Sequence, residues 1–176
     1  MKTKHKKSCS KKGCNTRKYK KGRRAIAILD NQDIKGIIKF AEATNSKGEK
    51  GVRIRYDIKG LKAGDHGFHI HEYGDLSHGC SSACDHFNPY NKKHGGLNTK
   101  ESHLGDLGNV RSKNNIARGS LFKKGLSLGY NKTSAVGRMI IVHSGKDDLG
   151  KGGNPESLKT GNAGSRIACA VIGLTN

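Results

Sequence analysis

Short apolar and alternating runs, separated by polar turns, recur along most of the chain. In the run 52–56 the apolar residues Val52, Ile54 and Tyr56 alternate with Arg53 and Arg55, which is the period of two expected of a strand with one buried face. Similar short runs occupy residues 25–29, 36–43, 67–72, 108–112, 116–122, 138–143 and 166–174. Strands of this length joined by short turns predict an antiparallel β-sandwich or barrel.

Two long polar segments interrupt this pattern. Residues 73–104 show no sustained periodicity and are rich in Gly, Asn, Ser and His. Residues 144–165 contain six glycines and two adjacent aspartates, Asp147 and Asp148. Structureless loops of this length are uncommon in compact domains unless something functional, such as metal ligands or a disulfide, holds them. We therefore expect two long functional loops.

Histidines gather in and beside the first loop. Five of the nine histidines, followed by a carboxylate, lie close together in the sequence: His69, His71, His86, His94, His103 and Asp106. On an extended segment His69 and His71 share one face, while Phe68 and Ile70 point to the opposite, apolar side. A lone pair of this kind also fits the polar face of an ordinary strand. Several neutral imidazoles with a carboxylate are ligands that zinc and copper prefer, so the whole stretch predicts a metal site.

The composition agrees with one strand-rich domain that carries a charged extension. The 176 residues include 25 glycines and only two prolines, which favours turns and short strands over long helices. The formal net charge is +20, but twelve of the 34 Lys and Arg residues lie in residues 1–24, which contain no acidic residue. Residues 25–176 therefore carry 22 basic against 14 acidic residues, a net charge of +8.

We divide the chain into a basic N-terminal tail (1–23) and a domain (24–176). The tail has too few apolar residues to bury and is predicted to be disordered. It is either an electrostatic arm for nucleic acid, another polyanion, an anionic membrane surface or nuclear import, or simply a solvated extension. His5, Cys9 and Cys14 within it are a poor match to the spacing of zinc ligands.

Membrane and secretion signals are not evident in the sequence. No run approaches the ~18 apolar residues of a membrane-spanning helix, and no apolar region follows the basic start. We expect neither a membrane span nor a secretory signal. The five cysteines are an odd number, so at least one is expected to be free or bonded to another molecule.

Several motifs resemble those of copper/zinc superoxide dismutases. They are GFHIHEYGD (67–75), HFNP (86–89), KHGG (93–96), HLGDLGN (103–109), DDLGKGGN (147–154) and TGNAGSRIAC (160–169), and the resemblance extends over residues 24–176. It implies an all-β fold, an eight-stranded antiparallel Greek-key β-barrel (an immunoglobulin-like sandwich) with two long functional loops. It also implies a homodimer, whose usual apolar contact positions hold Tyr73, Gly74, Val136, Gly137 and Leu174.

The resemblance further implies two neighbouring metal sites. It assigns copper to His69, His71, His86 and His143. It assigns zinc to His86, His94, His103 and Asp106, so that His86 bridges both metals. Asp147 matches the family's carboxylate that links the copper ligand His69 to the zinc ligand His94, and such a hydrogen bond fixes the tautomer and orientation of an imidazole.

Members of this family convert superoxide to oxygen and hydrogen peroxide, with redox-cycling copper beside structural zinc. The resemblance implies that His86 donates a proton and that Arg166 attracts and orients the superoxide anion, because a guanidinium group keeps its charge. A structural salt bridge is the alternative role for Arg166. Lys159 matches a lysine that the family uses to steer the anion, whereas Pro155 replaces one of the family's acidic residues.

Cys80 and Cys169 match the disulfide that the family forms within each subunit. In the chain-entropy model, closing a loop of this length contributes roughly 4–5 kcal/mol to stability. The family keeps this disulfide in the cytosol, so we expect a cytoplasmic location, with a nuclear or polyanion-associated location as the alternative that the tail offers. Cys84 departs from the family and is either an inert thiol or a competitor in disulfide exchange.

Two alternative functions remain open, one based on the metal-site residues and one on the tail. One is a catalytically silent copper/zinc-binding relative, used in metal delivery or storage. Relatives of that kind tend to lose a copper histidine or the arginine, and neither His143 nor Arg166 is lost. The other is a protein tethered to a polyanion that acts through its basic tail. A copper-loading helper is a further partner to consider for the enzyme.

Overall fold

The computed structural model describes residues 22–176. All but the last two residues of the predicted tail lie outside this range, so its disorder stays a prediction. In the described part no helix is long and apolar enough to cross a membrane. The same part forms nine strands, one short 3-10 helix and one short α-helix: β1 (Arg24–Asn31), β2 (Ile34–Thr44), β3 (Lys50–Lys59), β4 (Gly64–His71), η1 (Gly79–Ala83), β5 (Asp106–Ser112), β6 (Ile116–Lys124), β7 (Met139–His143), α1 (Ser157–Thr160), β8 (Arg166–Val171) and β9 (Gly173–Thr175).

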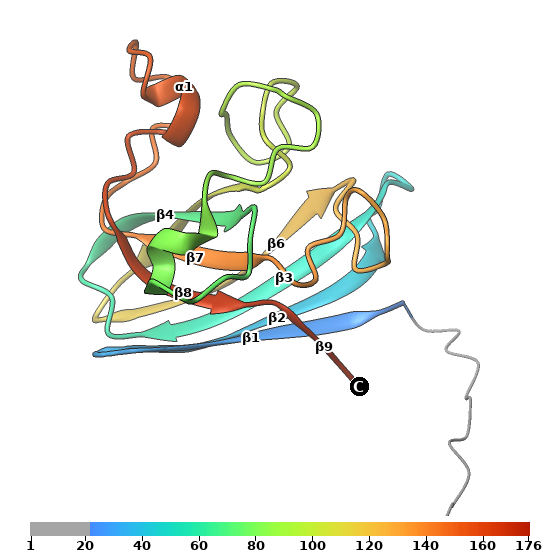
Figure 1. The fold of residues 1–176 in the computed structure, drawn as a ribbon, viewed down its shortest axis with the longest axis horizontal. Helices are drawn as coiled ribbons and strands as arrows, with labels where there is room; N and C mark the ends of the chain where they lie inside the picture. Colours follow the sequence, from blue (N-terminus) through green and yellow to red (C-terminus); the bar gives the residue numbers. More distant parts are fainter. Residues whose placement is uncertain (1–21) are drawn as a thin grey trace, which may run out of the picture.

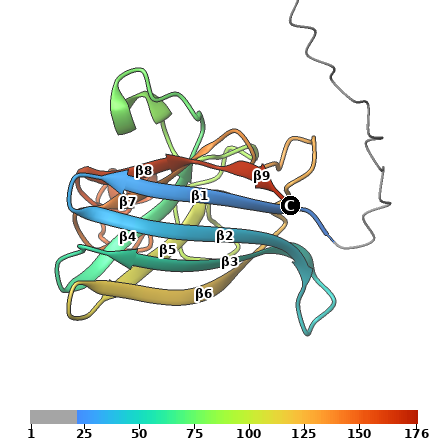
Figure 2. The same ribbon diagram turned by 90° about the horizontal axis from the view of Figure 1, so that it is seen from below.

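The strands form two antiparallel sheets that pack face to face (Figures 1 and 2). One sheet has five strands in the order β6-β3-β2-β1-β9, and the other has four in the order β5-β4-β7-β8. The neighbours β3 and β6, like β4 and β7, are far apart in the sequence, which is the pattern of a Greek key. The predicted all-β sandwich is therefore confirmed.

The core lies between the two sheets and follows the alternation read from the sequence. On β3, Val52 and Ile54 are fully buried while Arg55 is exposed. Phe40 on β2 belongs to the same core cluster as Val52 and Ile54 and comes from the same sheet. Phe68 on β4 joins this cluster from the opposite sheet. Burying an apolar side chain of this size contributes roughly 1.5–3 kcal/mol to the free energy of folding. The buried side chains of β4 therefore hold this strand against the five-stranded sheet.

The last predicted strand, residues 166–174, is divided between the two sheets. β8 pairs with β7 in the four-stranded sheet, and β9 pairs with β1 in the five-stranded sheet. Ile172 lies between them and is fully buried, with its N–H donated to the carbonyl of Arg138 at 2.9 Å. The eighth predicted strand thus supplies two elements and links both sheets.

The two long loops lie together over the four-stranded sheet, on the side away from the five-stranded sheet (Figure 1). Residues 72–105 join β4 to β5, and residues 144–165 join β7 to β8. All of β7, and residues 66–71 of β4, are buried rather than alternating between buried and exposed. One face of these strands packs on the core and the other is covered by the loops, so polar side chains on that second face are enclosed.

Candidate metal centre

The strand β4 presents two histidines to the loops. Phe68 and Ile70 point into the core, so His69 and His71 lie on the opposite face, where both are buried. Gly67 precedes them, and a Cβ atom there would lie 2.7 Å from the Cβ of Ala163 and 3.1 Å from Cε1 of His69. The absence of a side chain at Gly67 lets the second loop approach His69 closely.

A first group of imidazoles forms at this face. It contains His69, His71, His86 and His143, whose candidate ligand nitrogens all lie within 4.8 Å of one another. His143 is the last residue of β7, and His86 comes from the first loop. Nε2 of His71 and Nε2 of His143 are 3.4 Å apart and face each other. The fold therefore assembles this group from positions up to 74 residues apart in the sequence.

A second group shares His86 with the first. It consists of His86, His94, His103 and Asp106, again with ligand atoms within 4.8 Å of one another. Oδ1 of Asp106 lies 2.9 Å from Nδ1 of His86, 3.0 Å from Nδ1 of His94 and 3.2 Å from Nδ1 of His103. His86 thus directs Nδ1 to this group and Nε2 to the first.

Four buried nitrogens in these groups make no hydrogen bond of normal geometry with the described residues: His69 Nδ1, His86 Nε2, His94 Nδ1 and His103 Nδ1. Two of them, the Nδ1 atoms of His94 and His103, nevertheless lie within 3.2 Å of Oδ1 of Asp106. Buried polar atoms are normally paired, so a cluster of unpaired ones needs an explanation. One cation in each group would satisfy them all. Four imidazoles suit copper, and three imidazoles with a carboxylate suit tetrahedral zinc. The residues present therefore fit both metals.

A buried carboxylate joins the outer sides of the two groups. Asp147 accepts hydrogen bonds from Nε2 of His69 at 2.9 Å and from Nε2 of His94 at 2.8 Å. Asn109 holds Asp147 in turn, because its Oδ1 accepts from the Asp147 N–H at 2.8 Å and its Nδ2 donates to the Asp147 carbonyl at 2.9 Å. Asn109 ends the HLGDLGN motif, yet its role was not anticipated, because the contact is made between segments distant in sequence.

The surroundings set the charges of these groups in the metal-free protein. Burial, aided by nearby imidazoles, lowers the pKa of His69 to about 3 and that of His143 to about 4, which keeps both in the neutral form that binds metals. Burial would also lower the pKa of His94, but the neighbouring carboxylates of Asp106 and Asp147 outweigh it and raise that pKa to about 9. Burial would raise the pKa of Asp147, but the two imidazoles lower it to about 2.

Arg166, at the start of β8, lies beside the first group. Its guanidinium donates to the carbonyls of Cys80 at 2.8 Å, Ser81 at 3.1 Å and Cys84 at 2.5 Å. Within residues 22–176 it makes no salt bridge, so the structural ion pair considered as its alternative role is not found there. Together with His78, Cys80 and Ser81 it lines an open pocket of about 540 Å³. A positive charge is therefore available at a solvent-accessible surface.

The predicted disulfide is confirmed. Cys80 in η1 and Cys169 in β8 are bonded, with their Cα atoms 5.7 Å apart, which ties the first loop to the last part of the four-stranded sheet. Cys84 is a free, exposed thiol, and its carbonyl also accepts a hydrogen bond from Nδ1 of His71 at 2.8 Å. Its part in disulfide exchange stays a prediction, and Cys9 and Cys14 lie outside the described residues.

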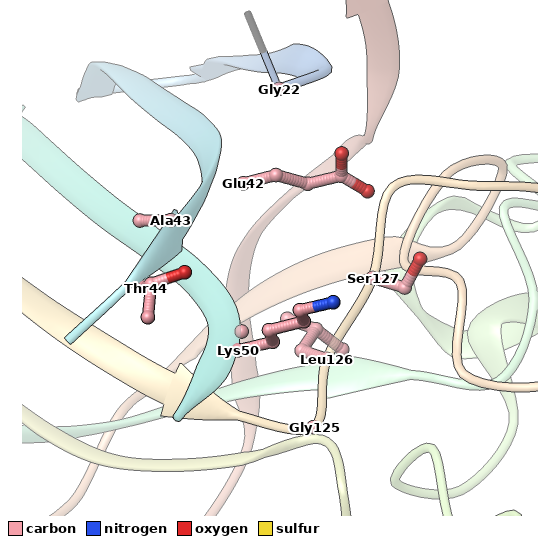
Figure 3. Close-up of a pocket in the computed structure, with 9 residues that line it drawn as sticks. Gly22, Glu42, Ala43, Thr44, Lys50, Gly125, Leu126 and Ser127 are labelled. Atoms are coloured by element: carbon pink, nitrogen blue, oxygen red, sulfur yellow. The ribbon is translucent and has the colours of Figure 1, made fainter. Parts of the chain in front are cut away.

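A second pocket lies where β2, β3 and the segment after β6 meet, away from the predicted ligands (Figure 3). It also measures about 540 Å³ and is lined by residues that include Glu42, Lys50 and Ser127. The carboxylate of Glu42 already accepts hydrogen bonds from the backbone N–H groups of Arg23 at 3.0 Å and Leu128 at 3.1 Å. The Glu42 side chain therefore links the residue before β1 to the segment that follows β6.

One buried cation near the second group was not anticipated. Lys123 is only 2% exposed, and its Nζ donates to the carbonyls of His103 at 3.0 Å and Asp106 at 2.9 Å. Burial lowers its pKa to about 8, against the opposing effect of the Asp106 charge. The sequence did hold a signal, because a period of two along β6 puts residue 123 on the same inward face as the buried Ala117.

Comparison with known proteins agrees with this geometry. A family model described as copper/zinc superoxide dismutase (SODC) matches residues 34–172. The chain belongs to the copper/zinc superoxide dismutase family. It is 51% identical over 151 residues to a superoxide dismutase [Cu-Zn] of Paramecium bursaria Chlorella virus 1, covering 85% of this chain and 77% of that one. It is 48% identical over 155 residues to the superoxide dismutase [Cu-Zn] of Saccharomyces cerevisiae, covering 86% and 98%.

The fold has the same relatives. A crystal structure titled as the clock protein EA4 superposes with a TM-score of 0.81 at 42% identity, covering 89% of this chain and 98% of that one. The protein is thus an oxidoreductase that converts superoxide to oxygen and hydrogen peroxide with copper and zinc as cofactors. One relative, from Onchocerca volvulus, is named an extracellular superoxide dismutase [Cu-Zn] and is 46% identical over 157 residues.

Proposed function

We propose that the first group of histidines holds the copper and the second group holds the zinc. His69, His71, His86 and His143 would bind copper, and His86, His94, His103 and Asp106 would bind zinc. The observation that supports this assignment is the set of buried nitrogens without partners, which occur in both groups and leave His86 with one such atom on the copper side. His86 is then the bridging ligand.

Bound copper supplies the one-electron redox steps, because zinc does not change its oxidation state. The residues of this chain bind the anion and handle its protons. Arg166 offers a permanent positive charge whose position is fixed by three carbonyl groups, so it attracts superoxide and holds it near the copper histidines. Nε2 of His86 is the unpaired atom that faces the copper side; when it does not bind the reduced copper, it would hold a proton instead and would donate that proton as peroxide forms.

Asp147 prepares the ligands for the metals. By accepting the Nε2–H of His69 and the Nε2–H of His94, it keeps the proton on the outer nitrogen of each ring. The Nδ1 atom of each ring is then free to bind a metal, which is the tautomer each site requires. Because one carboxylate serves both rings, the orientations of a copper ligand and a zinc ligand depend on the same side chain.

The assignment is tested by removing one histidine that belongs to the copper group alone. His143→Ala is expected to lose most bound copper and superoxide-removing activity in protein reconstituted with both metals, while zinc content is kept. His78→Ala is the matched control, because His78 is an exposed loop histidine outside both groups and should leave both metal contents unchanged. Full copper content in His143→Ala would refute the assignment.

A homodimer is the second part of the proposal. Ile28 on β1 and Ile37 on β2 are exposed and directly paired, and Leu174 on the adjoining β9 is exposed as well. Exposed apolar patches of this kind mark protein interfaces. Of these three residues only Leu174 was a predicted contact position. Two further predicted positions, Gly74 and Gly137, lie against each other, since a Cβ on Gly74 would be 2.2 Å from the Gly137 carbonyl oxygen.

The dimer is tested by sedimentation equilibrium at micromolar concentration. Ile37→Lys is expected to shift the mass towards that of one subunit, because it places a charge in the proposed interface. Ile116→Lys is the control, since Ile116 is also exposed but lies on β6 at the opposite edge of the sheet. A wild-type mass of one subunit would reject the dimer.

The predicted tail, domain division and location complete the proposal. We place the enzyme in the cytoplasm, with residues 1–23 as a polyanion-binding arm attached to the catalytic domain that starts at residue 24. The twelve Lys and Arg residues within residues 1–24 support this role. Retention on DNA that weakens with salt, and that is lost when the chain starts at residue 24, would support it, and equal retention of both chains would contradict it. A copper-loading helper is compatible with this location.

A further inference from the structure

Two neighbouring lysines at the end of β6 have opposite environments. Lys124 is exposed and its Nζ pairs with Oε1 of Glu49 at 2.6 Å. Lys123 points to the other face of the strand, into the core, where 2% of it is exposed. Within residues 22–176 no carboxylate lies within ion-pair distance of its Nζ. A buried ammonium group without an acidic partner is costly to desolvate, so an apolar side chain would serve packing alone better.

The hydrogen bonds of Lys123 are concentrated on one short segment. Its Nζ donates to the carbonyl of His103 at 3.0 Å and to the carbonyl of Asp106 at 2.9 Å. These are the first and last residues of the turn 103–106, which is also closed by a hydrogen bond of 2.8 Å from the His103 N–H to Oδ2 of Asp106. The ammonium group of Lys123 is thus hydrogen-bonded to both ends of the turn.

We propose that Lys123 is a positioning residue for the zinc site, fixing the turn that carries His103 and Asp106 so that both side chains are aimed at the metal before it binds. This inference rests on the proposed assignment of these two residues as zinc ligands. Its contacts are to backbone carbonyls, so it acts through the ligands and does not itself bind zinc. All of its hydrogen bonds lie on the zinc side, and none involves a copper-only ligand.

Electrostatic repulsion and positioning by Lys123 have opposite effects on zinc affinity, so the direction of the measured change distinguishes them. A buried cation near the site repels zinc, so electrostatic repulsion alone predicts that zinc binds more tightly when the charge of Lys123 is removed. Positioning predicts the reverse. Loss of a partner that orients a metal ligand typically weakens metal binding about 10- to 100-fold. Repulsion alone therefore predicts tighter zinc binding after loss of Lys123, and positioning predicts weaker zinc binding.

The test compares Lys123→Met with Lys124→Met, which removes the same charge from the adjacent, outward-facing position. The zinc dissociation constant of the metal-free protein is measured by competition with a chelator, the copper constant in parallel, and the absorption spectrum of cobalt(II) bound in place of zinc reports the ligand geometry. For Lys123→Met we expect roughly 10- to 100-fold weaker zinc binding, an altered cobalt spectrum and unchanged copper binding. Lys124→Met should match the wild type in all three measurements.

Further variants separate the ways in which the inference could fail. Lys123→Arg keeps the charge and the donors and should restore zinc binding in large part. If Lys123→Met does not fold, Lys123→Gln is used, because its amide can still donate to one carbonyl and should give a smaller loss. Zinc binding as tight as in the wild type, or tighter, in the folded variant would overturn the proposal, whatever its stability. His103→Ala tests the site itself: if it binds zinc normally, the ligand assignment fails instead.

Discussion

Substitution of Asp147 tests how this site is organised, because its two carboxylate oxygens accept different numbers of hydrogen bonds. Oδ1 accepts hydrogen bonds from Nε2 of His94 at 2.8 Å and from the N–H of Leu149 at 2.7 Å. Among the described residues, Oδ2 accepts from Nε2 of His69 alone, at 2.9 Å. In Asp147→Asn one oxygen becomes an NH2 group, which donates instead of accepting. The amide oxygen should take the Oδ1 position, where two donors need it, and the NH2 group should face His69.

His69 must then either leave its Nε2–H unpaired or move the proton to Nδ1, which is its copper-facing atom. A buried hydrogen bond to a charged group is worth about 1.5–3 kcal/mol, and about 1.4 kcal/mol is a factor of ten in an equilibrium constant. Asp147→Asn should therefore weaken copper binding roughly ten- to hundredfold. Zinc binding should change less, because His94 keeps an acceptor.

Chelator competition on the metal-free variant measures both affinities, with superoxide removal followed as copper is added back. Asp148→Asn is the matched control, since the adjacent Asp148 bonds Ser157 and Asn162 and contacts no histidine of either group. Activity of Asp147→Asn should recover with excess copper. Weaker zinc binding with unchanged copper binding would refute the reasoning, because it would mean that the amide takes the opposite orientation.

Three further predictions concern the pocket, the disulfide and pH. Arg166→Ala should retain both metals but remove superoxide at least several-fold more slowly, with the difference shrinking as salt is added; equal rates at low salt would reject its role. Cys169→Ser opens a bridge between positions 89 residues apart and should lower the free energy of unfolding by roughly 4–5 kcal/mol in denaturant titrations; an unchanged midpoint would contradict this. Zinc must displace a proton from His94, whose pKa is about 9, whereas His69 and His143 are neutral above about pH 4. As pH falls from 9 to 6, zinc affinity should therefore drop by up to about tenfold per unit from this proton while copper affinity changes less, and parallel losses would refute the difference.

Much of the architecture follows from local pattern. The alternation of Val52 and Ile54 with Arg53 and Arg55 predicts a half-buried strand, and β3 is one. The two polar segments without periodicity are the two loops that cover the four-stranded sheet. Local pattern does not reveal that residues 166–174 serve both sheets, because Ile172 is apolar like its neighbours and the division is imposed by pairing with β7 on one side and β1 on the other.

For the metal site, too, the sequence predicts some features and not others. The five clustered histidines predict a metal site by themselves, and the family motifs add His143 and Arg166. The sequence does not predict that Arg166 is held by the carbonyls of the disulfide loop, since backbone groups carry no residue identity. Nor does it distinguish Lys123 from Lys124 by composition; only the period of two along β6 separates them, and a lysine on the inward face runs against the usual expectation.

The division of the final strand has a consequence for synthesis. Within residues 22–176 the first strand, β1, pairs along its outer edge with the last, β9, so this pairing cannot form until residues 173–175 have been made. Until then β1, which carries the exposed Ile28, is an open sheet edge, and open edges recruit other strands. Pairings between such distant segments also form slowly. The nascent protein is therefore prone to aggregation until residues 173–175 have been made and have paired with β1.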